Sequence, residues 1–149
     1  MCDNLAKSDA GDGQRQGSGT AGIRCLYVVG QHAYIAGGSS GLYVVDISRP
    51  ANPKRVTSVD TPGEAHGVYQ LYDLLVVADG SRGLQLIDIR ESKSLGIIAA
   101  YETPGETRNV YGLASTVYVA GSGFGLGVFD VIDRSRLNQN GHFLVNPNR

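Results

Sequence analysis

The side chains best suited to bind a ligand stand at one position of a repeating pattern. Arg24, His66 and Arg108 follow one another at intervals of 42 residues. Glu64 and Glu106 lie two residues before the second and the third of them. An arginine offers a planar fork of N–H donors that fits a carboxylate or a phosphate. If these side chains converge, they predict an anion-binding site; if each arginine pairs with a glutamate, they only solvate a rim.

Three aspartates also recur, and acid catalysis is the chemistry to test for them. Asp46, Asp88 and Asp130 are 42 residues apart, each near the end of a short apolar run. With one in each repeat, they are expected to lie far apart, whereas acid–base catalysis needs groups within hydrogen-bond reach of one substrate. An Asp after a strand usually accepts hydrogen bonds from the backbone of the following turn. We therefore predict a structural role for all three.

Patterns typical of metal or nucleotide sites are missing. His32, His66 and His142 occupy different positions of the repeat, and no His-x-x-x-His or Glu-x-x-His spacing is present. Asp79 begins a glycine-rich turn, but one carboxylate gives too few oxygen ligands for a calcium ion. The glycine-rich segment 121–127 has neither a lysine nor a following helix, so a phosphate loop is not expected. We predict no catalytic residues, no metal and no cofactor, and we favour a protein that is not an enzyme while leaving that question open.

A repeat that covers most of the chain must position these residues. Heptads of the form Gly-Leu-x-apolar-apolar-Asp-apolar begin at Gly41, Gly83 and Gly125, again at intervals of 42 residues. The segment Thr-Pro-Gly-Glu at 61–64 returns at 103–106. A fixed period of this size indicates a repeat architecture. We expect the three heptad glycines to be structural, because glycine supplies the positive φ that tight turns need.

Two regions follow from this register. Residues 1–22 are polar and glycine-rich, which predicts a flexible tail. Residues 23–149 hold the repeats, with boundaries at about 23–64, 65–106 and 107–148, the last of them degenerate.

Each repeat is predicted to form four short antiparallel strands. In the second repeat, apolar runs at 65–71, 74–78, 84–89 and 96–102 are separated by turn residues. The third run carries apolar residues on both alternating faces, which is typical of a sheet buried on both sides. A β-propeller blade is buried in this way between its neighbours, and about 40–45 residues are usual for one blade. We predict an all-β, propeller-like fold of about three blades, with these residues buried between blades: Val44, Leu86 and Val128.

The heptads resemble the LVIVD repeat. The segments Asp46-Ile-Ser-Arg-Pro-Ala-Asn-Pro53 and Tyr34-Ile-Ala-Gly-Gly38 share this resemblance, which covers about residues 23–131. It implies a β-propeller of the kind found in bacterial and archaeal proteins that are often exported or attached to the cell surface. It transfers no catalytic residue to this chain. The third repeat lacks the Ser-x-Pro-x-x-Pro turn after Asp130, so only a degenerate fourth strand is expected there.

Composition narrows the range of partners. The net charge of −1 argues against a broad electrostatic grip on nucleic acid. The sequence has no apolar stretch of the roughly 18 residues that a transmembrane helix needs. Cys2 stands where a lipidated cysteine would stand in a mature bacterial lipoprotein whose signal was replaced by Met, and the alternative is an ordinary cysteine near a native start. From the resemblance we expect a location outside the cell, on its surface or in the periplasm.

The number of repeats sets up a problem of closure. Closed propellers usually have about four to eight blades. Three blades leave two open sheet faces, which we expect to expose Tyr43, Val45 and Phe129. Such apolar patches normally mark an interface. We therefore predict either a homo-oligomer or further blades of a longer chain.

Three functions remain open at this point. The first is a non-catalytic module for protein interaction or scaffolding. The second is a ligand-binding or enzymatic propeller with an anion site at the channel mouth, where the first strands of the blades begin. The third is a building unit of a larger exported or surface protein.

Overall fold

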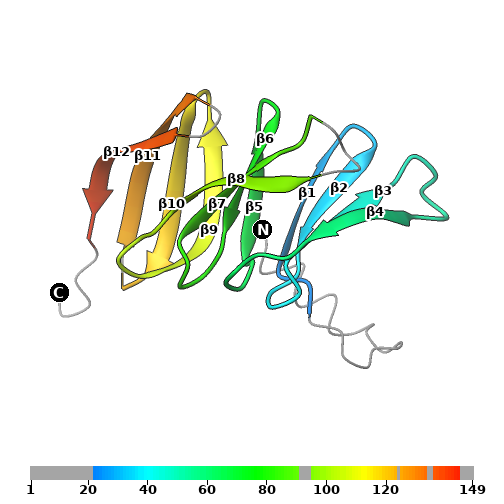
Figure 1. Cartoon of the computed structure of the whole chain (residues 1–149), viewed down its shortest axis with the longest axis horizontal. Helices are drawn as coiled ribbons and strands as arrows, with labels where there is room; N and C mark the ends of the chain where they lie inside the picture. The colour runs from blue at the N-terminus through cyan, green and yellow to red at the C-terminus, as the bar shows by residue number, and fades with distance from the viewer. Residues whose placement is uncertain (1–21, 91–94, 124, 134–135, 145–149) are drawn as a thin grey trace.

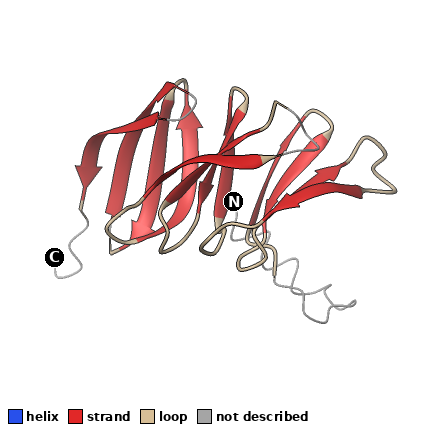
Figure 2. Ribbon diagram, viewed as in Figure 1, coloured by secondary structure: helices blue, strands red, loops and turns tan. Residues whose placement is uncertain are grey.

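Twelve strands form three four-stranded antiparallel sheets, and the described residues contain no helix (Figure 2). This computed structural model describes residues 22–90, 95–123, 125–133 and 136–144. The prediction of an all-β fold with four-stranded blades is confirmed. The expected flexible tail and Cys2 lie outside the described residues, so both stay predictions.

The strands follow the chain within each sheet, as expected of propeller blades. The first sheet contains β1 (Cys25–Val29), β2 (His32–Ala36), β3 (Leu42–Asp46) and β4 (Lys54–Val59). The second contains β5 (Gly67–Leu71), β6 (Leu74–Ala78), β7 (Leu84–Asp88) and β8 (Gly96–Tyr101). The third contains β9 (Glu106–Leu113), β10 (Thr116–Ser122), β11 (Gly125–Asp133) and β12 (Arg136–Phe143). The degenerate third repeat therefore keeps a complete fourth strand.

The three sheets stand side by side in chain order, with the second between the other two (Figure 1). Their first strands, β1, β5 and β9, are neighbours in space. Two isolated backbone bridges join consecutive sheets, Gly38 with Ala65 and Gly80 with Thr107. Both partners of the second bridge lie 42 residues after those of the first, so the joint between sheets repeats together with the sequence.

Each sheet has two apolar faces, one on the side of the preceding sheet and one on the side of the following sheet. We call the face toward the preceding sheet the leading face and the face toward the following sheet the trailing face. In the first joint, Leu42 and Val44 of a trailing face pack with Leu75 and Ile87 of a leading face. The second joint repeats this arrangement with residues of the second and third sheets: Leu84, Leu86, Val117 and Phe129.

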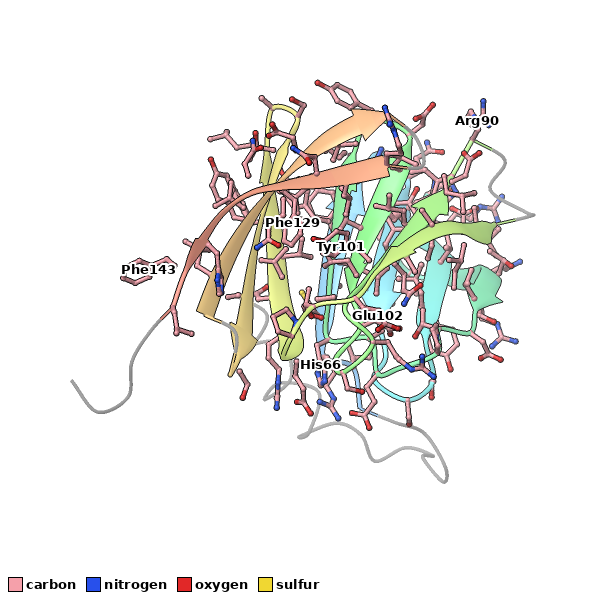
Figure 3. All side chains as sticks on the ribbon, turned by 60° about the vertical axis from the view of Figure 1, so that its left-hand side comes forward. His66, Arg90, Tyr101, Glu102, Phe129 and Phe143 are labelled. Carbon is pink, nitrogen blue, oxygen red and sulfur yellow. The ribbon has the colours of Figure 1, made fainter. Side chains whose placement is uncertain are left out.

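The face directions correct two expectations. Val44 and Leu86 are buried as predicted, at 0% and 1% exposure, whereas Val128 is only partly buried because it lies on the trailing face of the last sheet. Phe129 was expected to be exposed, and this is wrong: it is 0% exposed. Its ring meets Tyr101 edge to face at 4.9 Å, inside the second joint (Figure 3).

Candidate functional site

The residues that the sequence analysis placed at the channel mouth lie at the end of the sheets where β1 and β5 begin. We call Arg24, Glu64, His66, Glu106 and Arg108 the rim cluster. His66 stands in its centre, and its side chain lies near the bottom of the view in Figure 3. Nη1 of Arg24 lies 3.1 Å from Nδ1 of His66, and Oε1 of Glu64 lies 3.7 Å from the other ring nitrogen, Nε2.

The second arginine of the rim cluster has a partner of its own. Nη2 of Arg108 donates a hydrogen bond to Oε1 of Glu106 at 2.8 Å. Both side chains are about half exposed, so water screens this pair and its net contribution to stability is small. Arg108 and Glu106 still act on His66 through their charges. The structure therefore has features of both interpretations. The side chains converge, as an anion site requires, and Arg108 also pairs with a glutamate, as expected of a solvated rim.

His66 is held in its neutral form. An arginine only donates hydrogen bonds, so the contact with Arg24 requires Nδ1 to accept, and the ring proton then lies on Nε2, facing Glu64. Burial lowers the pKa of His66 most, and the charges of Arg24 and Arg108 lower it further. Glu64 and Glu106 oppose this shift without reversing it.

A hollow of about 370 Å³ opens beside the rim cluster. Its lining combines two carboxylates, one imidazole and several turn residues: Ser39, Pro62, Gly63, Glu64, His66, Gly80, Ser81 and Glu106. The two arginines do not line the hollow. Its lining therefore carries the two carboxylates and the imidazole of the rim cluster but neither guanidinium group.

Two serines of this lining were not singled out from the sequence. Ser39 and Ser81 are 42 residues apart, and each follows a glycine with φ of +62°. Residues 37–41 have the Gly-x-Ser-x-Gly spacing of a nucleophile elbow, but strand β3 follows them where that motif needs a helix. Both nitrogens of His66 face Arg24 and Glu64, so the ring is not directed at either serine.

Asp79 is a second residue that sequence reasoning undervalued. It is fully buried, and its Oδ2 accepts a hydrogen bond at 2.9 Å from the amide of Gly63, which lines the hollow. Its other oxygen, Oδ1, has no hydrogen-bond partner in the described part of the chain. Burial raises the pKa of Asp79, although the nearby Thr61 and Gln85 side chains and the Gly63 amide offset part of this effect. The carboxyl group thus holds the loop that follows β4.

Two of the recurrent aspartates, Asp46 and Asp88, are the last residues of their strands, whereas Asp130 lies within β11. Asp46 accepts a hydrogen bond from the amide of Ser48 at 2.8 Å, and Asp88 accepts one from the amide of Arg90 at 3.0 Å. Asp130 uses side-chain donors instead: the Thr116 hydroxyl, at 3.2 Å, and the amide group of a residue of β12, Asn140. The backbone hydrogen bond of Ser48 is the main cause of the lowered pKa of Asp46.

The recurrent glycines have a common geometric reason. Gly41, Gly83 and Gly125 have φ of +84°, +77° and +85°. An added Cβ would overlap a backbone carbonyl oxygen near the end of the fourth strand in each sheet. Only glycine meets both demands, so the first residue of the heptad is fixed by the backbone.

A row of tyrosine rings runs along the first strands. The ring centroids of Tyr27 and Tyr69 lie 4.8 Å apart, and those of Tyr69 and Tyr111 lie 5.1 Å apart. Both pairs are tilted by similar angles, 51° and 53°. Tyr111 closes the row on the open side of the third sheet and is 61% exposed. Tyrosines 42 residues apart in sequence are therefore in contact in space, and we call this row the tyrosine ladder.

The described residues contain no group of three His, Cys, Asp or Glu side chains that could hold a metal ion. Within the same residues, no helix is long and apolar enough to cross a membrane. Both results concern only this part of the chain.

Comparison with known proteins agrees with this geometry. Residues 24–61 match the LVIVD repeat. The resemblance read from the heptads is confirmed over this segment, which covers the first sheet. No curated protein matches the chain.

Solved structures show the same kind of fold. The crystal structure of the N-terminal domain of Nup159 superposes with a TM-score of 0.53 at 15% identity, over 85% of this chain and 32% of that chain. A structure of S. cerevisiae Dbp5 bound to Nup159, Gle1, IP6 and ADP gives 0.52 at 14% identity, over 85% and 31%. At such identities the likeness shows the propeller-like fold alone. The chain spans about a third of the length of the structures it matches.

Proposed function

We propose that this chain is a non-catalytic β-propeller repeat module that works by protein interaction or scaffolding, through the end faces of its row of sheets. The observation that carries this proposal is the apolar character of both end faces. The leading face of the first sheet and the trailing face of the third have no sheet packed against them among the described residues.

The exposed residues on these faces are of the kind that interfaces bury. Val28 is 51% exposed on the first sheet, and Tyr111 is 61% and Phe143 64% exposed on the third. Phe143 projects from β12 on the outer side of the third sheet (Figure 3). Contiguous apolar patches on a soluble protein normally mark a binding surface, and aromatic side chains are enriched at the centre of such surfaces.

The native mass of the protein tests this proposal. We expect the chain, cross-linked gently in the cells that produce it and purified under native conditions, to have a mass well above its own 15.7 kDa. Replacing Val28 and Tyr111 together by Asp should return it to the monomer mass. Tyr72→Asp is the matched control, because Tyr72 is exposed in the β5–β6 turn and lies on neither end face. A monomer mass for the unmodified protein would contradict the proposal.

We also propose an exported or surface-associated location. The LVIVD repeat supports it, because the family resemblance implies such proteins. Fractionation of the source cells, followed by protease treatment of intact cells, tests the location. Protein found only in the cytoplasm would contradict it.

A second candidate function is anion binding at the rim cluster. It is favoured by the position of Arg24 and Arg108 on either side of His66 and weakened by the two carboxylates that line the hollow. Calorimetry with phosphate and with a small dicarboxylate tests it: Arg108→Ala should abolish the binding. Arg90→Ala is the control, since Arg90 pairs with Asp88 at the same 2.8 Å but lies outside the rim cluster. Absence of binding to the unmodified protein would leave the cluster as a solvated rim.

A further inference from the structure

We propose that the two end faces bind each other, so that a second copy of this chain docks head to tail. The leading face of the first sheet of one copy would pack on the trailing face of the third sheet of the other. This inference rests on the proposed role of the end faces as binding surfaces and names their partner.

The first argument is the register of the repeat. The trailing face of the third sheet carries Tyr118, Leu126 and Val128. At spacings of 42 and 84 residues, these positions correspond to side chains that the two internal joints bury: Tyr34, Leu42 and Val44 in the first, Val76, Leu84 and Leu86 in the second. The open face therefore repeats, with conservative changes, a surface that the chain covers twice.

The same holds for the opposite end. The leading face of the first sheet carries Leu26, Ile35 and Val45. The corresponding residues of the next two sheets are buried in the internal joints: Val68, Val77 and Ile87 in the first, Val110, Val119 and Phe129 in the second. The trailing face of the third sheet in one copy and the leading face of the first sheet in another copy therefore correspond to the two faces that pack together in each internal joint.

The tyrosine ladder gives the second argument. Inside the chain, each ring of the ladder lies about 5 Å from the next, which is a favourable separation for tilted aromatic pairs. Tyr111 ends the ladder with an exposed ring, and Tyr27 begins it. A head-to-tail neighbour would bring its own Tyr27 to Tyr111 and continue the row without a break.

Two positions show where the joint between copies would differ from the internal joints. Ser122 stands at the position of Gly38 and Gly80, but it pairs with Glu106 of its own sheet. The backbone bridge of the internal joints is therefore not expected between copies. Arg55 covers the ring of Tyr43 at 5.8 Å on the leading face, at the outer strand β4. The joint rests on the side chains of the inner three strands.

Because this contact joins two different faces, it determines how many copies can form a closed ring. A contact between two different faces is heterologous, and it forms a closed ring only when the rotation between copies brings the last face back to the first. Two copies with three sheets each would give six sheets, within the usual four to eight blades of a closed propeller. We therefore infer a two-fold dimer that contains two identical joints.

Light scattering of the purified full chain at micromolar concentration tests the dimer. We expect twice the mass of 15.7 kDa. Val28→Asp damages the leading face. Tyr111→Asp damages the trailing face and also removes the ring contact with Tyr69 inside the chain. Each should weaken self-association by about 100-fold because a charge is buried without a partner. Both residues are exposed in the single chain, so the sheets should fold, and circular dichroism checks this. Tyr72→Asp should remain dimeric.

Mixing the two variants separates a head-to-tail joint from its alternatives. The intact trailing face of V28D can pair with the intact leading face of Y111D, so the mixture should form a heterodimer held by one joint. If the dimer instead formed through one face binding its own kind, only the variant damaged on that face would lose the dimer, and this would overturn the inference. A folded monomer of the unmodified chain would also overturn it. If the cross-linked mass from source cells still exceeded the monomer mass, the proposed function would stand with another protein, or another blade, as the partner.

Discussion

At the scale of single residues, His66 is a side chain whose charge depends on its neighbours in the fold. Its Nδ1 accepts from Arg24, so protonation would turn an N–H toward a guanidinium group and break that contact. Because burial and the two arginines lower its pKa in the folded chain, the unfolded chain binds the proton more readily. The contribution of His66 to stability is therefore present above its ordinary pKa of about 6.5 and is lost as the pH falls through the lowered folded value.

His66→Gln should remove this part of the pH dependence. The Gln side chain can still accept from Arg24 but does not titrate, so unfolding free energies between pH 7.5 and 5 should fall less steeply than in the unmodified protein. Denaturant unfolding at several pH values measures the slope, and NMR of the imidazole reports its pKa directly. A folded pKa of His66 at or above the ordinary value would contradict the arrangement of the rim cluster.

Asp79 is expected to behave in the opposite sense. Burial raises its folded pKa, so its contribution to stability is present below the unfolded pKa of about 3.9 and is lost as the pH rises through the folded value. Asp79→Asn keeps an oxygen for the Gly63 amide without a charge and should stabilise the protein at pH 7, with a smaller gain near pH 4. Asp79→Ala removes that hydrogen bond and should cost about 1–3 kcal/mol. Denaturant unfolding at pH 7 and pH 4 measures the free energy of unfolding of each variant. An Asn variant less stable than the unmodified protein at pH 7 would refute this account.

At the scale of the elements, the heptad glycine fixes how the third strand of a sheet begins. Gly83→Ala should cost about 2–4 kcal/mol, because it combines a left-handed φ with an overlap at the Tyr101 carbonyl. Gly96→Ala, in β8, is the control, since an added Cβ there meets nothing within 4 Å. Urea unfolding of both variants provides the measurement. Equal losses would mean that the turn adapts to alanine.

The strands themselves were predictable from sequence to within a few residues. The predicted runs 74–78 and 84–89 became β6 and β7, because short apolar runs bounded by turn residues are typical of strands buried on both faces. The direction of the faces was not predictable. Phe129 and Val128 are both apolar neighbours on one strand, and only the order in which the sheets pack decides that the first is buried and the second lies on an open face.

The site was predictable only in outline. The 42-residue spacing placed Arg24, His66 and Arg108 at the same end of successive first strands, which follows from the repeat. Spacing carries no information about which acid each base contacts. Asp79 was undervalued because the other two repeats have glycine at its position, so its burial depends on contacts across the sheet that no local pattern reveals.

At the scale of the whole molecule, stability comes from two joints between three sheets. Leu86 is almost fully buried in the second joint, and Leu86→Ala should cost about 2–5 kcal/mol. Val128 occupies the equivalent position on the open trailing face, so Val128→Ala should cost less than about 1.5 kcal/mol when Val28→Asp blocks self-association. Denaturant unfolding compares the two. A loss at Leu86 as small as that at Val128 would place Leu86 outside a packed joint.

The middle sheet differs from its neighbours in one respect that bears on how the molecule melts. Every residue of β6 is buried, because this strand has a sheet on both sides, whereas the strands of the end sheets have cover on one side only. Since each sheet contacts only its neighbours in the row, the two end sheets should unfold locally before the middle sheet does. Amide hydrogens of β6 and β7 should then exchange with solvent last and those of β12 among the first. In the proposed ring of two copies, no sheet is left at an end, so local unfolding would lose its starting points.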